Sequence, residues 1–352
     1  MKIGFISTYS NSLPPLTYGG ESYYYGLVKT LSDLGHEVHL FAPGGSRRPK
    51  NGYLYYIHGT KDGCINCAIE DWVERKYHDI LMSMDIIHDC SLSHITAERL
   101  RYLYGKKEII NTINGSTYYL PRPPFNVVTG SKFWQQEALN SGLKTEMIYW
   151  GIDTDFYTPE GKKEDYLLWI ARFHPDKGLD IALDLAEILG FKLKVAGSLL
   201  FKDHQYYGKQ YIKRIKTIPN VEYVQLPSDS THHIVKRELY RAAKAFLYPV
   251  QYNECFGMVV MEALSCGCPV ITTDRGAMPE LVEDGKIGFI CKSKLDFTNA
   301  INKIDEYDRK GKMHPGLDLS KNCRKNAENF SWLKATEEYV KLYEEVIGGK
   351  TW

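Results

Sequence analysis

One strand–helix–strand stretch limits what this chain can fold into. The apolar run at 245–250 predicts a buried strand, the residues at 257–265 predict a helix, and those at 270–273 predict a second strand. Such units build parallel sheets, which bind ligands outside the carboxyl ends of their strands. The carboxylates of Glu254 and Glu262 are separated by seven residues. They are therefore expected at this edge of a sheet, one in the loop after the first strand and one inside the helix.

The same stretch carries groups that suit a ligand with phosphates and hydroxyls. Gly257 has no side chain, so a ligand can approach its backbone closely. The amides of Gly257, Met258 and Val259 at the start of the predicted helix favour an anion such as phosphate. Glu254 and Glu262 can accept hydrogen bonds from hydroxyl groups, and a nucleotide sugar combines these features. The alternative is a pair of solvated glutamates, but the helix around Glu262 is apolar and a charge there needs a partner.

Length and composition narrow the class of protein. The 352 residues can form two domains that each bury a core. The net charge of +1 gives no support for a nucleic-acid partner, and no apolar run reaches the roughly 18 residues of a membrane span. The eight cysteines are scattered, which favours reduced thiols in a cytoplasmic protein. Cys64 and Cys67 have a redox-like or zinc-like spacing without a matching second pair, so we interpret them as loop thiols of unassigned role.

The rest of the chain alternates between predicted strands and helices, which is typical of a doubly wound parallel sheet. In the first half, strands are expected at 2–7, 37–41, 53–57, 85–89, 108–113, 126–129 and 146–149, and helices at 19–34, 70–82, 95–103 and 132–141. In the second half, strands are expected at 166–171, 192–196, 221–225, 245–250, 270–273 and 288–291, and helices at 231–243, 257–265 and 331–347.

The sequence from Glu254 to Leu281, together with the overlapping run from Gly267 to Val282, resembles the signature of retaining GT4-type glycosyltransferases (glycosyl transferases group 1). The resemblance implies the GT-B fold, an α/β architecture of two Rossmann-like doubly wound parallel-sheet domains that face a deep cleft. It places an acceptor domain at 1–157 and a nucleotide-sugar donor domain at 158–330. A C-terminal helix in 331–352 is expected to cross back and pack on the first domain.

The resemblance also assigns roles to residues of the second half. Arg172 and Lys177 lie in a stretch similar to the family's basic loop, where they would grip the two phosphates and stabilise the leaving nucleoside diphosphate. Glu254 would contact the hydroxyls of the donor sugar, and we include it with Arg172 and Lys177 among the catalytic residues. Glu262 would bind the ribose hydroxyls. The amides of Gly257, Met258 and Val259 would hold the phosphates and the sugar.

In the first half, the resemblance names four further residues. Gly19 and Gly20 belong to a glycine-rich loop that lies near the donor phosphates in the family, so they are expected to bind the donor. His88 ends a predicted strand and is a catalytic candidate. A donor-contacting histidine normally follows the next strand, and Asn114 replaces it here. Asn114 can hydrogen-bond to the donor but cannot carry a proton, which leaves full activity open.

The function implied is that of a metal-independent, hexosyltransferase-like enzyme with UDP or GDP sugars as donors and no cofactor. The acceptor is open and can be a glycan, a lipid-linked sugar or a small molecule. Two alternatives are a nucleotide-sugar epimerase of the same fold and a non-catalytic nucleotide-sugar-binding protein. The basic residues at 47–50 and 99–107 are candidates for a peripheral membrane contact by a cytoplasmic protein.

Overall fold

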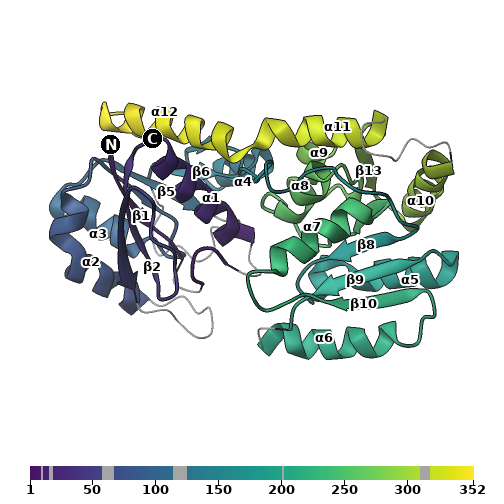
Figure 1. Ribbon diagram of the computed structural model, residues 1–352. Helices are drawn as coiled ribbons and strands as arrows, with labels where there is room; N and C mark the ends of the chain where they lie inside the picture. The colour runs from purple at the N-terminus through teal and green to yellow at the C-terminus, as the bar shows by residue number, and fades with distance from the viewer. Residues whose placement is uncertain (9–10, 16–18, 58–66, 114–124, 200–201, 310–317) are drawn as a thin grey trace. The chain divides into compact units, whose positions relative to one another are not determined.

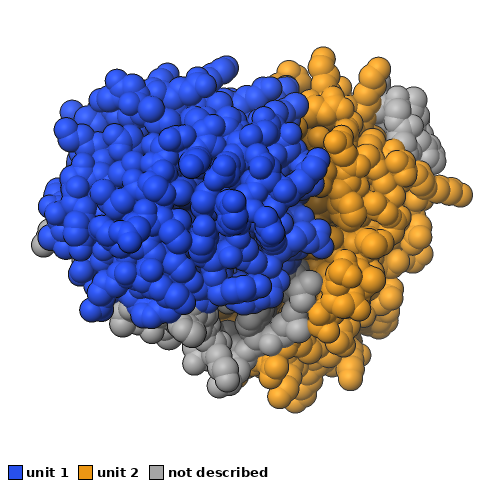
Figure 2. Space-filling model, turned by 60° about the vertical axis from the view of Figure 1, so that its left-hand side comes forward, with its two compact units in different colours: residues 1–151, 332–352 blue, residues 152–331 orange. Residues whose placement is uncertain are grey.

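The computed structural model describes residues 1–8, 11–15, 19–57, 67–113, 125–199, 202–309 and 318–352 (Figure 1). The chain forms two compact units, coloured separately in Figure 2. Unit 1 contains residues 1–151 and 332–352, and unit 2 contains residues 152–331.

The described part of unit 1 is a parallel sheet of seven strands in the order β3-β2-β1-β4-β5-β6-β7. The strands are β1 (Lys2–Ile6), β2 (Glu37–Pro43), β3 (Gly52–Ile57), β4 (Ile86–Asp89), β5 (Ile109–Ile113), β6 (Val127–Thr129) and β7 (Thr145–Met147). The helices are α1 (Gly19–Asp33), α2 (Cys67–Met82), α3 (Ile95–Tyr104), α4 (Lys132–Asn140) and α12 (Trp332–Ile347).

Side-chain alternation along the strands of unit 1 gives its sheet two different buried faces. Ile87 of β4 packs in one cluster with Val73 of α2 and Leu100 of α3. The next residue of β4, His88, points to the other face and stacks on Tyr339 of α12 with ring centroids 5.0 Å apart. Helices therefore cover both faces, and the terminal helix α12 is part of the core of unit 1.

The described part of unit 2 is a parallel sheet of six strands in the order β10-β9-β8-β11-β12-β13. The strands are β8 (Leu167–Ile170), β9 (Leu193–Gly197), β10 (Val221–Gln225), β11 (Ala245–Tyr248), β12 (Val270–Thr273) and β13 (Gly288–Cys291). The helices are α5 (Leu179–Leu189), α6 (Lys202–Ile215), α7 (His232–Ala242), α8 (Met258–Ser265), α9 (Met278–Leu281), α10 (Lys294–Arg309) and α11 (Asp318–Ala327).

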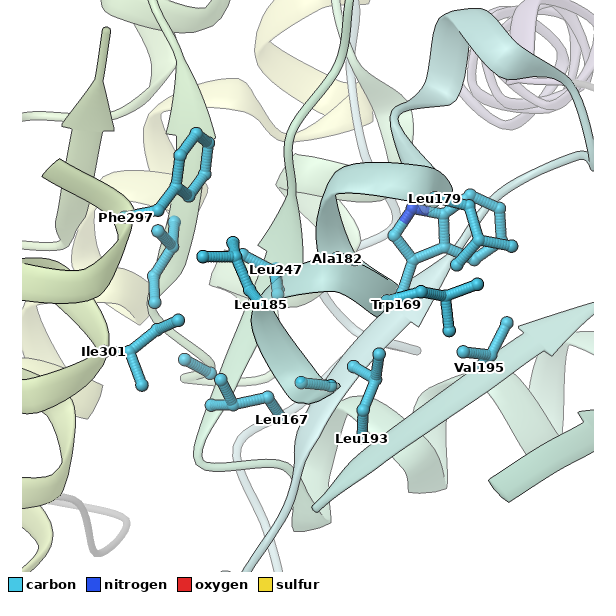
Figure 3. Packing of buried hydrophobic residues seen from close by; sticks show 14 of the residues in the cluster. Leu167, Trp169, Leu179, Ala182, Leu185, Leu193, Val195, Leu247, Phe297 and Ile301 are labelled. Carbon is cyan, nitrogen blue, oxygen red and sulfur yellow. The ribbon is translucent and has the colours of Figure 1, made fainter. Parts of the chain in front are cut away.

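Alternate strand residues of unit 2 build its main core (Figure 3). Trp169 of β8 and Leu247 of β11 are fully buried in one cluster with Leu185 of α5 and Ile301 of α10. Because Trp169 and Leu167 are two residues apart in β8, both side chains point to this face. The two doubly wound parallel sheets confirm the fold class that the sequence predicts.

The strand order of unit 2 reverses direction at β8. This strand pairs with β9 on one side and with β11 on the other, and the connection after β8 runs toward β9 whereas the connection after β11 runs the opposite way, toward β12. Ligands of open α/β sheets bind at such a switch point, outside the carboxyl ends of the two adjacent strands. The loops that follow β8 and β11 meet there, and they carry four of the predicted site residues.

Candidate functional site

Backbone contacts join the loops after β8 and β11. Residues Pro175–Lys177 form a short 3-10 helix that ends at Gly178, where φ is +70°. A Cβ on Gly178 would lie 1.8 Å from the carbonyl oxygen of Pro249, so another residue cannot occupy this position without displacing the second loop. The amide of Gln251 donates to the carbonyl of Asp176 at 2.7 Å. These contacts hold Lys177 beside the loop that contains Glu254.

Lys177 and Glu254 form an ion pair with two tyrosines around it. The ammonium Nζ of Lys177 lies 3.0 Å from Oε2 of Glu254, and the two side chains are only 11% and 13% exposed. The hydroxyl of Tyr248 donates to Oε2 of Glu254 at 2.6 Å, and the hydroxyl of Tyr252 donates to Oε1. Lys177 in turn donates to Tyr248 at 3.1 Å and to Tyr252 at 2.5 Å.

These contacts determine the charge of Glu254. Burial alone raises the pKa of this carboxyl, but the charge of Lys177 and the hydrogen bonds from Tyr248 and Tyr252 outweigh it, and the pKa is lowered. Glu254 is therefore ionised at neutral pH and serves as a hydrogen-bond acceptor. A carboxylate of this kind can accept hydrogen bonds from the hydroxyls of a sugar.

Arg172 is the more accessible cation of the same loop. Its side chain is 39% exposed, and its Nη2 lies 3.1 Å from Oδ2 of Asp176. A guanidinium has five N–H donors, so the contact with Asp176 leaves others for the oxygens of an anion. The structure thus places a buried cation, Lys177, and an exposed cation, Arg172, in one loop.

Helix α8 begins directly after the loop of Glu254. Gly257 precedes the helix with φ at +99°, and no side chain caps this end. The first intrahelical bonds are those from the amides of Val260 and Met261 to the carbonyl of Gly257, at 2.9 and 3.2 Å. The amides of Met258 and Val259 come before them and have no acceptor within the helix. This is the amide arrangement that the sequence predicts as a phosphate site.

Glu262 lies on α8 in surroundings that resemble those of Glu254. Its side chain is 4% exposed, and Nζ of Lys236 lies 2.6 Å from its Oε2. Tyr240 donates to Oε2 and Tyr157 donates to Oε1, each at 3.2 Å. The buried carboxylate of Glu262 on the apolar helix thus has Lys236 as its counterion. Each of the two glutamates is held by one lysine and two tyrosine hydroxyls.

His88 does not lie where we expected a catalytic residue. Its side chain is fully buried in unit 1, with Nδ1 2.6 Å from the hydroxyl of Tyr343 and Nε2 2.6 Å from Oγ1 of Thr112. Both ring nitrogens are occupied, and burial lowers the pKa to about 3. The residue ends a strand, as expected, but α12 covers its side chain. His88 is thus part of the core of unit 1, and its expected catalytic role stays a prediction.

The burial of His88 predicts a pH dependence of stability. The unfolded chain binds a proton at the ordinary pKa near 6.5, whereas the folded chain does not until about pH 3. The contribution of His88 to stability is thus complete above pH 6.5 and is lost by about 1.4 kcal/mol per pH unit as the pH falls below it. Denaturant unfolding should show that the advantage of the natural protein over His88→Asn shrinks at this rate between pH 6.5 and 4.5. A constant difference would contradict the prediction.

The structure does not test the expected roles of the remaining predicted residues of the first half. Gly19 and Gly20 form the first turn of α1. Asn114 and Cys64 lie outside the described residues, and Cys67 is the first residue of α2. Their expected roles stay predictions.

Lys236 and four tyrosines complete the site and were not among the predicted residues. The tyrosines are Tyr157, Tyr240, Tyr248 and Tyr252. A signal existed for two of the five, because Lys236 and Tyr240 are four residues apart on a predicted helix and so share one face. Tyr248 is the last residue of the apolar strand β11, and nothing in the local sequence indicates that its hydroxyl contacts Glu254.

The described residues contain no group of three or more histidine, cysteine, aspartate or glutamate side chains that could hold a metal ion. Asp153 and Asp155 have the Asp-x-Asp spacing of some metal sites, but Asp153 accepts a hydrogen bond from the amide of Phe156 at 3.0 Å, so its carboxylate stabilises a turn. In the described ranges, no helix has the length and apolar character needed to cross a bilayer.

The basic residues considered for a membrane contact are partly engaged within unit 1. Arg99 pairs with Glu74 at 3.0 Å, and Lys106 donates to the carbonyl of Met84 at 2.6 Å. The guanidinium of Arg48 donates to the carbonyl of Gly52 at 2.9 Å. Peripheral membrane contact stays a prediction.

Comparison with known proteins adds independent evidence. The family model described as "Glycosyl transferases group 1" matches residues 153–330, about half of the chain. This range includes Arg172, Lys177, Glu254 and Glu262.

Two curated relatives match nearly the whole chain. Spore coat protein SA of Bacillus subtilis is 24% identical over 98% of this chain and 100% of its own length. An uncharacterised glycosyltransferase of Methanocaldococcus jannaschii is 27% identical over 91% of this chain and 92% of its own length.

Two solved structures support the fold. Sucrose-phosphate synthase of Thermosynechococcus elongatus superposes with a TM-score of 0.82 at 16% identity, over 99% of this chain and 100% of that chain. The Anabaena protein HepE in complex with UDP-glucose superposes with a TM-score of 0.72 at 18% identity, over 98% of this chain and 100% of that chain. At these identities the likeness concerns the architecture.

Proposed function

Because this chain belongs to the glycosyl transferases group 1 family, we propose that it moves a sugar from a nucleoside diphosphate sugar to an acceptor hydroxyl with retention of configuration. Unit 2 would hold the donor, and unit 1 would bind the acceptor. The acceptor's class is open among glycans, lipid-linked sugars and small molecules.

The observation that carries the proposal is the buried Lys177–Glu254 pair at the switch point of unit 2. An ionised carboxylate and an ammonium sit side by side where open α/β sheets bind ligands. The carboxylate suits the hydroxyls of a sugar, and the cation suits a diphosphate. A nucleoside diphosphate sugar presents both groups next to each other.

Each residue of the site then has a role in the transfer. Glu254 accepts hydrogen bonds from the sugar hydroxyls and so orients the anomeric carbon. Arg172 and Lys177 stabilise the negative charge that grows on the phosphate as its bond to the sugar breaks. Glu262 accepts from the ribose hydroxyls, since a carboxylate has about four acceptor sites and three are used here. The first amides of α8 hold phosphate oxygens.

Retention follows when the acceptor attacks from the side that the phosphate leaves. The bond between the anomeric carbon and the phosphate oxygen breaks, and a bond to the acceptor oxygen forms on the same face. The proton of the acceptor hydroxyl passes to the departing phosphate oxygen. This route needs no side chain as base, and the loop cations offset the charge of the leaving group, so we propose that the enzyme works without a metal ion or cofactor.

The first experiment is a thermal-shift screen against UDP, GDP, ADP and their common sugars. A ligand at 100 times its Kd stabilises the folded state by about 2.7 kcal/mol, which raises the melting temperature. UDP-glucose is the first donor to test, because HepE was solved in complex with it. We expect a shift in melting temperature with one nucleotide class. The shift should be lost in Arg172→Ala and kept in the control Lys194→Met, because Lys194 pairs with Glu164 at 3.3 Å near the amino end of β9, away from the site.

The donor that binds is then incubated alone and with candidate acceptors. Slow hydrolysis to a free sugar of the same anomeric configuration supports the transferase. Formation of a C2 epimer would identify an epimerase instead. Binding without hydrolysis, transfer or epimerisation would favour a non-catalytic binding protein.

A further inference from the structure

Two tyrosines connect the charged groups of the donor site in a closed network. The ammonium of Lys177 donates to the hydroxyls of Tyr248 and Tyr252, and each hydroxyl donates onward to a different oxygen of Glu254. A direct contact of 3.0 Å joins Lys177 to Glu254. Each hydroxyl thus accepts from the cation and donates to the anion. With these three contacts the ammonium uses all of its protons.

We propose that Tyr248 and Tyr252 are positioning residues of the donor site, which fix the Lys177–Glu254 pair and keep Glu254 ionised. The inference rests on the proposed function for its consequence in catalysis. The part of the inference that concerns the ionisation of Glu254 rests on the hydrogen-bond geometry and not on the proposed function.

Burial explains why such support is needed. A carboxylate that loses water is destabilised, and an ion pair in a dry site holds only when further hydrogen bonds satisfy its remaining atoms. Tyr248 supplies one of these from the end of β11, where it is 1% exposed. Tyr252 supplies the other from the loop, and its ring lies 4.3 Å from Nζ of Lys177. The ring adds a cation–π contact that restricts the ammonium.

The groups around Glu254 set the pKa that a titration of its carboxyl would measure. Lys177, Tyr248 and Tyr252 lower the pKa of the carboxyl, and burial raises it. Arg172 and Asp176 from the loop after β8 act electrostatically on Tyr252. When one tyrosine donor is removed, the ionised form loses a hydrogen bond and the pKa must rise.

The test uses Tyr252→Phe, Tyr248→Phe and a matched control. In Tyr166→Phe the lost hydroxyl donates to the carbonyl of Leu239 at 2.9 Å, so a partly buried hydrogen bond disappears away from the site. The acid limb of the pH profile of kcat/KM should move to higher pH by about one to two units in the two site variants. It should not move in Tyr166→Phe, even if that variant melts at a lower temperature.

A second readout does not depend on activity. In protein labelled with 13C at glutamate side-chain carboxyls, the Glu254 signal is identified by its absence in Glu254→Gln. Its midpoint should rise by the same one to two pH units in Tyr252→Phe. An unchanged midpoint would overturn the inference whether or not the protein transfers sugar. A raised midpoint in a protein without any transferase activity would support the inference and reject the proposed function.

Discussion

Replacing Lys177 by methionine is expected to lower kcat about 100- to 1000-fold, the effect of removing one group that stabilises developing charge in a buried site. Lys177 is the cation that lies next to Glu254, at 3.0 Å, and its partners hold it in place. Without it, the departing diphosphate loses one positive charge and Glu254 loses its counterion. Both changes act at the bond-breaking step, so kcat should fall more than the affinity for the donor. Stopped assays of transfer or donor hydrolysis at saturating donor measure the effect.

Two further variants separate chemistry from folding in this experiment. The double variant Lys177→Met with Glu254→Gln carries no unpaired buried charge, so it should regain stability but remain inactive. Lys194, like Lys177, lies near a glutamate and a tyrosine ring, here Glu164 and Tyr166. It stands near the amino end of β9 and not at the carboxyl end where the site lies, so Lys194→Met serves as the control. We expect it to keep full activity. If Lys177→Met retained more than a tenth of the natural kcat, Lys177 would not stabilise the leaving group.

Replacing Lys236 by methionine is expected to destabilise unit 2 by about 3–5 kcal/mol, because it leaves the carboxylate of Glu262 buried without a counterion. The lysine and glutamate side chains are 10% and 4% exposed and lie 2.6 Å apart. Tyr157 and Tyr240 still donate to the carboxylate, but neither carries a charge. For a unit of this size the loss corresponds to a fall of roughly 6–20 °C in melting temperature. Differential scanning calorimetry would measure it.

An exposed ion pair of the same unit serves as the control. Lys286 pairs with Glu283, and the side chains are 67% and 60% exposed. Such pairs contribute about 0–1 kcal/mol, so Lys286→Met should leave the melting temperature nearly unchanged. Glu262→Gln combined with Lys236→Met should recover much of the stability. A loss below about 1 kcal/mol in Lys236→Met alone would show that water reaches Glu262.

The inner strands of both sheets could be predicted because their apolar runs are short and continuous, as in a parallel sheet buried on both faces. Five helices of unit 2 were not predicted, namely α5, α6, the short α9, α10 and α11. In α10 the buried residues Phe297, Ala300, Ile301 and Ile304 follow the helical repeat, so the sequence itself indicates this helix. In α11 the buried apolar residues Leu319, Cys323 and Ala327 are four positions apart, so a helical repeat is present there too, although the buried Ser320 beside them is polar.

The site was predictable at the level of loops and not of contacts. Strand order explains why Lys177 and Glu254, far apart in sequence, come together. Which hydroxyls surround them depends on side-chain directions that no local pattern records. The burial of His88 has a similar origin, because the residues that enclose it, Tyr339 and Tyr343, follow about 250 positions later on α12. The end of a strand looks the same in sequence whether or not such a helix covers it.

The division of the chain also has a consequence for its synthesis. Unit 2 occupies residues 152–331, and the last helix of unit 1 follows it. A ribosome adding about 5–20 residues per second needs roughly 10–40 s to make this insertion. During that interval unit 1 has its sheet but not α12, so the sheet face that carries His88 is uncovered. The nascent chain therefore exposes this apolar face of unit 1 until α12 has been made, and chaperone binding is expected to matter most during that interval.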